Sequence, residues 1–299
     1  MTYVSTAFQL THLLQRVYDK LEQTKGLLAT GGSATTVVDS AISADVEDDA
    51  YNGYTAFVAY DAGGAGVSPE GKYRRVTDYV ASNTTLTLDA TVTDAIAAGD
   101  LITIANGSKF PLNDVIRLCN NALRKLGRVP SLDVSLTTAA NQTEYNLPAT
   151  VQWDEIVLVE LQGNTADAND NRYVEIPRGS YKIVPPSVPG GTAVLVLPQY
   201  SSGYIVRLTS IGEHPVIQDY DDYISKAIPP TLAVSACALE IARWKRNAID
   251  KELMKSLEMD YEIALLRHPV TKFIRQTGGM PHWSNSVTDT VPSPINYGV

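Results

Sequence analysis

The sequence changes its periodicity abruptly at residue 27 and again near residue 105, and this change constrains the fold more than any other feature. Before it, apolar side chains recur at helical spacing across residues 5–25 (Phe8, Leu13, Leu14, Val17, Tyr18 and Leu21). Between the two changes the chain is rich in Thr, Val, Ala, Gly and Asp. Alternating runs typical of strands occupy 54–60, 72–80, 84–88 and 100–104. Residues 27–105 are therefore predicted to form an all-β module inserted after a helix.

Beyond the insertion, helical and strand patterns alternate. A second helix is predicted over 111–126, where proline suits the first turn and Gly127 suits the end. Strands are expected at 144–147, 155–162, 172–176, 193–197 and 204–209. A long helical stretch then covers 230–267, and its apolar stripe drifts around 245–250, which predicts a kink or a break there.

These elements predict an α+β fold: a helical bundle with a small β layer, plus the inserted all-β module and an extended carboxyl-terminal tail. We expect residues 1–26 to be the first helix of the core domain, 27–105 the inserted module, 106–275 the helical and β core, and 276–299 the tail. The tail has almost no periodicity, so it is expected to gain order only against another surface. Its candidate partner-binding residues are the large side chains Trp283, Ile295 and Tyr297.

The negative charge of the chain is concentrated in the insertion. The full sequence carries 24 basic and 33 acidic side chains, a formal net charge of −9. Residues 27–105 contain eleven of the acids and three of the bases, so they account for −8 of this charge. Proteins that grip nucleic acid depend on clustered Lys and Arg, and this distribution argues against that class. No apolar run reaches the roughly 18–20 residues that cross a bilayer.

The sequence contains no group of residues with the spacing of a catalytic or metal site. Phosphate-binding loops and nucleophile elbows are missing. The acidic run 45–49 lacks the layout of a calcium loop. Cys119 and Cys237 are expected on separate helices as buried thiols. The four histidines are not paired at metal-ligand spacing (His12, His214, His268 and His282). We therefore predict no enzymatic activity, no cofactor and no metal.

From Leu112 to Arg267 the sequence resembles the head-to-tail connector, or adaptor, proteins of tailed bacteriophages. The resemblance lies in a helix ending ALRKLG (122–127), the run TEYNLP (143–148) before a strand, the strand YIVRL (204–208), and IPP (228–230) opening the helical run VSACALEIA (234–242). In that family the helices form a bundle, a few strands cover one end, and about twelve copies form a ring beneath the portal. The insertion between the first two helices departs from the simplest adaptors.

The resemblance implies a structural virion protein, assembled in the host cytoplasm, that forms the adaptor ring between portal and tail. The implied partners are the portal protein, a tail or neck protein, and further copies of this chain in a ring of about twelve. DNA would pass through the ring without specific binding, and no membrane is involved. Because the carboxyl ends of the family commonly reach the portal, residues 276–299 are expected to dock there.

Two other functions are compatible with the sequence. The first is a receptor- or carbohydrate-binding virion protein that uses the tyrosine-rich insertion as its binding module (Tyr51, Tyr54, Tyr60, Tyr73 and Tyr79). The second is an enzyme whose site is assembled from scattered residues, which the lack of clustered titratable groups disfavours.

Overall fold

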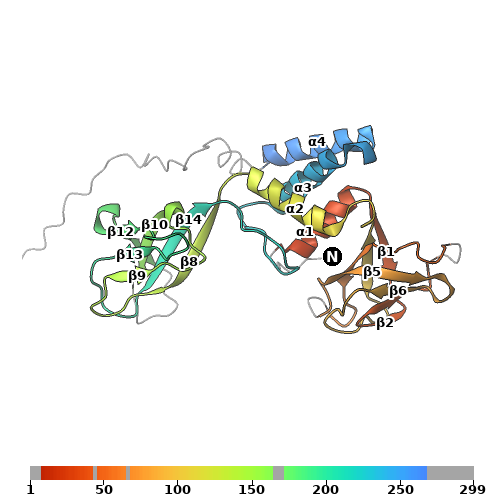
Figure 1. Cartoon of the computed structure of the whole chain (residues 1–299), viewed down its shortest axis with the longest axis horizontal. Coiled ribbons are helices and arrows are strands. Elements are labelled where there is room, and N and C mark those ends of the chain that lie inside the picture. The colour runs from red at the N-terminus through yellow and green to blue at the C-terminus, as the bar shows by residue number, and fades with distance from the viewer. Residues whose placement is uncertain (1–7, 43–45, 65–67, 164–171, 268–299) are drawn as a thin grey trace, which may run out of the picture. The chain divides into compact units, whose positions relative to one another are not determined.

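The computed structural model describes residues 8–42, 46–64, 68–163 and 172–267. These residues form two compact units (Figure 1). The first combines 8–127 with 214–267, and the second is 128–213, each without the gaps just given. The chain therefore leaves the first unit after Gly127 and returns to it at His214.

The α-helices of the described residues all belong to the first unit. They are α1 (Leu10–Lys20), α2 (Leu112–Lys125), α3 (Pro230–Trp244) and α4 (Lys251–Arg267). α3 contacts each of the other three, and α4 lies on its outer side (Figure 1). α3 is buried almost all round because nearly all its residues up to Leu239 are apolar or small. The break between α3 and α4, at residues 245–250, confirms the interruption predicted there.

α1 and α2 are amphipathic, and each buries one face. In α1 the buried side chains Leu10, Leu13, Leu14 and Val17 follow the i, i+3, i+4, i+7 spacing. α2 begins after Pro111, one residue from its predicted start. It ends before Gly127, whose φ of +121° is one that L side chains rarely adopt.

A seven-stranded antiparallel sheet follows α1. Its strands are β1 (Thr24–Leu28), β2 (Gly31–Ser33), β3 (Thr36–Val38), β4 (Thr55–Tyr60), β5 (Tyr73–Val80), β6 (Thr85–Leu88) and β7 (Leu101–Ala105). Their order in the sheet is β1-β7-β4-β5-β6-β3-β2. Side chains from opposite ends of this order, such as Leu27 in β1 and Val37 in β3, share one buried cluster with Val76 and Ile104. The sheet therefore curls around a core of its own.

The other face of this sheet packs on the helices. Phe57 in β4 is fully buried, and its ring centroid lies 6.1 Å from that of Tyr18 in α1. Gln15 Nε2 donates a 3.0 Å hydrogen bond to Thr103 Oγ1 in β7. β1 and β7 pair with each other, with Thr24 opposite Ala105, so the chain enters and leaves the sheet side by side. For this reason the inserted strands and the helices form one compact unit.

The second unit consists of two small antiparallel sheets. The first has the order β11-β10-β14-β8, from β8 (Val129–Thr137), β10 (Ile156–Gln162), β11 (Tyr173–Glu175) and β14 (Ile205–Gly212). The second has the order β12-β13-β9, from β9 (Glu144–Asn146), β12 (Lys182–Val184) and β13 (Val194–Val196). Val159 and Leu208 of the first sheet share a buried cluster with Tyr145 and Leu195 of the second.

The prediction of a helical bundle with a small β layer is wrong. The described chain is mostly sheet, in three antiparallel sheets of seven, four and three strands. The physical reason is visible in the second unit, where the strands bury their apolar side chains in a cluster contributed by both of its sheets. They form a β unit with its own core rather than a layer that covers helices.

Candidate assembly surface

α4 is held on the first unit by one face. Leu257 and Ala264 are its buried residues, and they lie on the same side of the helix, seven positions apart. Two ion pairs flank this contact. Arg243 of α3 lies 3.8 Å from Glu258, and Lys20 of α1 pairs with Asp260. Both pairs are partly exposed, so they orient the helix more than they stabilise it.

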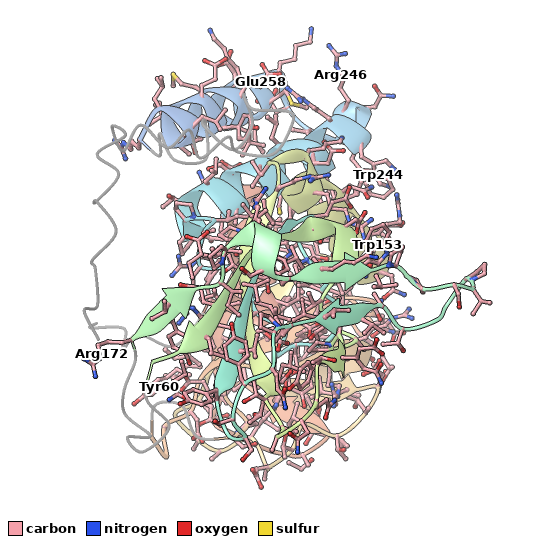
Figure 2. All side chains as sticks on the ribbon, turned by 90° about the vertical axis from the view of Figure 1, so that its left-hand side faces the viewer. Tyr60, Trp153, Arg172, Trp244, Arg246 and Glu258 are labelled. Atoms are coloured by element: carbon pink, nitrogen blue, oxygen red, sulfur yellow. The ribbon has the colours of Figure 1, made fainter. Side chains whose placement is uncertain are left out.

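The opposite side of α4 carries a line of large apolar side chains. Met259, Ile263 and Leu266 are spaced i, i+4, i+7, and their exposed fractions are 59%, 39% and 72%. On a helix of 3.6 residues per turn they project away from Leu257 and Ala264. Figure 2 shows α4 at the outer edge of the first unit, with Glu258 on the helix and Arg246 in the segment that precedes it. We call these three side chains the α4 stripe.

A groove of about 450 Å³ runs beside the α4 stripe, between α1, α3 and α4. Its walls carry charges of both signs, and Ile263 belongs both to the stripe and to the groove. The residues that line the groove are Arg16, Asp19, Lys20, Thr231, Val234, Ser235, Asp260, Ile263, Ala264 and Arg267. Apolar surface bordered by mixed charge is the composition of a protein–protein contact. The groove and the stripe together form the candidate assembly surface.

The acids of the insertion divide into structural and surface groups. Asp39, Asp61 and Asp100 are buried, and their carboxylates accept hydrogen bonds from backbone N–H groups. Asp39 accepts from Leu28 and Ala41, and Asp61 accepts from Gly63. Asp100 accepts from Ala62 and Ala97. These three carboxylates hold loops and strand ends in place. Exposed acids remain on the outside of the sheet (Glu47, Asp48, Asp49, Asp89 and Asp94). The surface of the insertion is therefore acidic.

The tyrosines of the insertion do not form an exposed binding platform. Tyr79 is fully buried, and Tyr51 is 8% exposed. Their rings meet edge to face at 4.9 Å, and Tyr54 packs on Tyr51 at 5.4 Å. Tyr73 packs against Phe57. Most of these side chains are core residues, so nothing in their placement favours the receptor- or carbohydrate-binding alternative.

The residues that the sequence singled out for chemistry lie apart from one another or inside the fold. Cys119 and Cys237 are free and buried where α2 packs on α3, and burial raises the pKa of the Cys237 thiol. His12 forms part of the capping box of α1, and His214 is buried in the segment that precedes α3. His268, His282 and the partner-binding candidates Trp283, Ile295 and Tyr297 lie outside the described residues.

Two further observations concern metal binding and the membrane. Within residues 8–42, 46–64, 68–163 and 172–267, no three His, Cys, Asp or Glu side chains gather as a metal site would require. In the same ranges every helix is too short or too polar to cross a membrane.

The α4 stripe was not identified from the sequence. The helical pattern assigned Leu253, Leu257, Tyr261 and Leu265 to the apolar face of 230–267. Met259, Ile263 and Leu266 form a second apolar line on the same helix, and this line was the signal available. Comparison of the chain with models of known protein families and with curated proteins finds no match.

Proposed function

We propose that this protein is a structural virion protein that forms a head-to-tail adaptor ring between the portal and the tail of a bacteriophage. The observation that carries the proposal is the α4 stripe. A line of three large apolar side chains on the outer side of a helix is costly to leave in water, and such surfaces mark contacts with other proteins. Together with the resemblance of residues 112–267 to phage adaptors, it favours an assembly role over catalysis.

The candidate assembly surface supports contact between copies of the chain. A contact between two different surfaces of the same protein generates a ring when the rotation between copies closes. α1 contributes Arg16 and Asp19 to the groove, and α4 contributes Asp260 and Arg267, so each of these walls carries both signs and a neighbour with mixed charge fits the groove. The ring that we propose has about twelve copies, the number that the resemblance implies.

The acidic insertion supports passage of DNA rather than its retention. Exposed carboxylates repel phosphates, so a ring lined or bordered by them does not hold the strand. About twelve copies, each with a formal charge of −9, would make the whole ring strongly negative. The proposed partners are the portal protein, a tail or neck protein and further copies of the chain, and the proposed location is the virion.

Residues 276–299 are proposed to dock on the portal through Trp283, Ile295 and Tyr297. The test uses DNA-filled heads from infected cells that lack this protein. Full-length protein added to these heads should bind saturably, at about twelve copies per head, as counted after gradient sedimentation. A chain truncated after residue 275 should keep its melting temperature and lose this binding, whereas a Ser284→Ala variant should bind normally. Binding that does not saturate, or equal binding to portal-free shells, would overturn the proposal.

A further inference from the structure

A positively charged hollow, distinct from the groove beside the α4 stripe, lies at the break between α3 and α4. Its volume is about 450 Å³. The residues that line it are Arg246, Asn247, Ile249, Lys251, Met254, Lys255 and Glu258. Its apolar members are partly buried, whereas its three cationic side chains are exposed. We call Arg246, Lys251 and Lys255 the basic corner.

The charge of the basic corner is not neutralised within the described chain. Among residues 8–42, 46–64, 68–163 and 172–267, no ion pair or hydrogen bond engages these three side chains. Glu258 is the acid in the lining of the hollow, and it already lies 3.8 Å from Arg243. Residues 243–255 contain five basic and two acidic side chains, so their net charge is +3 on a chain whose total is −9.

The position of these cations on α4 is itself unfavourable. Lys251 is the first residue of the helix, and Lys255 follows on the same side one turn later. The amino end of a helix carries the positive end of its dipole, where a cation is destabilising and an anion is favoured. An anionic partner at the basic corner would remove this repulsion.

An exposed tryptophan adjoins the basic corner. Trp244, the last residue of α3, is 40% exposed, and Lys245 Nζ lies 4.7 Å from its ring centroid. Figure 2 shows Trp244 and Arg246 at the same edge of the first unit. Tryptophan and arginine are enriched among the side chains that contribute most to binding at protein–protein interfaces. The composition of this surface therefore fits an acidic protein partner.

The surface of the insertion has the matching charge. Its exposed acids include Glu47 and Asp94, whose carboxylates have no hydrogen bond or ion pair with any residue that the structure describes. In Figure 1 the inserted sheet and α4 lie at opposite ends of the first unit, with α1 and α2 between them. The acidic surface and the basic corner therefore cannot meet within one chain, but they can meet between two copies.

We propose that the basic corner binds the acidic surface of the insertion of a second copy of this chain. The contact joins two different surfaces of the same protein, so it orders the copies head to tail and closes into a ring when the rotation between them closes. Complementary charge of this kind steers the approach of two proteins and fixes their register. The proposal rests on the proposed function only in that copies of the chain assemble.

The test is sedimentation velocity of the nuclease-treated full-length protein over a range of concentrations, at low and at high salt. The wild type should self-associate, and more strongly at low salt, because salt screens exposed charges. A chain that stays monomeric at every concentration in low salt would contradict the proposal. Self-association without binding to DNA-filled heads would contradict the adaptor function alone, and binding to heads by a monomeric chain would contradict this contact alone.

Charge-reversal variants identify the two surfaces. Arg246→Glu with Lys251→Glu should weaken self-association about tenfold or more, and so should Glu47→Lys with Asp94→Lys. These side chains are exposed and have no partner among the described residues, so melting temperatures should stay unchanged. A chain with all four changes should regain most of its self-association, because each contact again pairs opposite charges. If it associates no better than the two-residue variants, the two surfaces do not meet.

Two controls exclude a general effect of charge and a nucleic-acid partner. Lys182→Glu with Lys226→Glu changes the net charge by the same amount at exposed lysines elsewhere, and this variant should associate as the wild type does. Duplex DNA added to the wild type should not bind at the basic corner. Binding of DNA that Arg246→Glu with Lys251→Glu abolishes would make nucleic acid the partner and overturn the proposal.

Discussion

The hydroxyl of Tyr18 in α1 donates a 2.6 Å hydrogen bond to the backbone carbonyl oxygen of Phe110, two residues before α2 begins. Both residues are fully buried, and burial raises the pKa of Tyr18 above its ordinary value, so the phenol stays protonated as a donor. The bond joins the two helices that the insertion separates in the sequence. It fixes the place where the chain returns from the sheet.

Removing this hydroxyl should destabilise the first unit. Tyr18→Phe leaves the Phe110 carbonyl buried without its donor, which costs about 1–3 kcal/mol of unfolding free energy. The measurement is urea unfolding followed by circular dichroism. Tyr223→Phe, on an exposed side chain, is the control and should change the free energy by less than about 0.5 kcal/mol. Similar losses in both variants would show that the hydrogen bond does not lock α1 to the start of α2.

His214 should make stability fall in mild acid. It is buried, its Nδ1 lies 2.7 Å from the Pro215 carbonyl oxygen, and its Nε2 accepts the Ser225 N–H at 3.0 Å. The neutral ring satisfies both contacts when Nδ1 carries the proton. Burial lowers the pKa of His214, with a smaller lowering from the Arg124 charge, while the Pro215 contact opposes them.

The sign of the pH dependence follows from this lowered pKa. The unfolded chain takes up a proton near pH 6.5, whereas the folded state takes it up at lower pH. Stability should therefore be full above about pH 6.5 and fall as the pH is lowered toward the folded-state pKa, by at most about 1.4 kcal/mol per pH unit. Urea unfolding between pH 5 and pH 7.5 measures this slope. His214→Gln should flatten it more than His12→Gln does; an unchanged slope in His214→Gln would contradict the assignment.

Asp100 should be essential to the insertion. Its side chain is fully buried, and its two oxygens accept the N–H groups of Ala62 at 2.9 Å and Ala97 at 2.8 Å. Asp100→Ala leaves both donors without a partner and should cost about 2–4 kcal/mol by thermal or urea unfolding. Asp94→Ala, on an exposed side chain nearby in the sequence, should be neutral. If the two variants are equally stable, the Asp100 carboxylate does not hold these loops.

Strands with a strong local pattern could be predicted from the sequence. β4, β5, β6 and β7 were each placed within one residue of their bounds, because β-branched or aromatic alternation between turn residues is a local signal. β8 was missed. It carries Pro130, exposes Leu132 and Val134, and lies at the edge of its sheet with an irregular register, so alternation fails there.

The fold class was not predictable in the same way, because it depends on which surfaces the strands bury. The sequence around Val159 and around Leu195 predicts strands. It does not show that the two side chains pack in one cluster between their sheets rather than against a helix. The candidate surface on α4 was hidden for a similar reason. Only the packing of α4 on α3 shows that Leu257 faces inward and Leu266 outward.

The α4 stripe should matter for assembly and not for folding. Met259 and Leu266 are mostly exposed, and glutamine is a good helix former, so Met259→Gln with Leu266→Gln should change the unfolding free energy by less than about 0.5 kcal/mol. The same variant should bind poorly to DNA-filled heads. Leu132→Gln, at an equally exposed leucine in β8, is the matched control and should bind normally. Normal binding by the α4 variant would remove the stripe from the proposed interface.

The most direct test of the adaptor account is a cryo-electron microscopy reconstruction of the neck of virions that contain this protein. The account predicts a closed ring of about twelve copies between the portal and the tail, with α4 of each copy at the contact with a neighbour. A reconstruction with the protein at the capsid surface, on a fibre or in a two-fold dimer, and no copies at the neck, would contradict it.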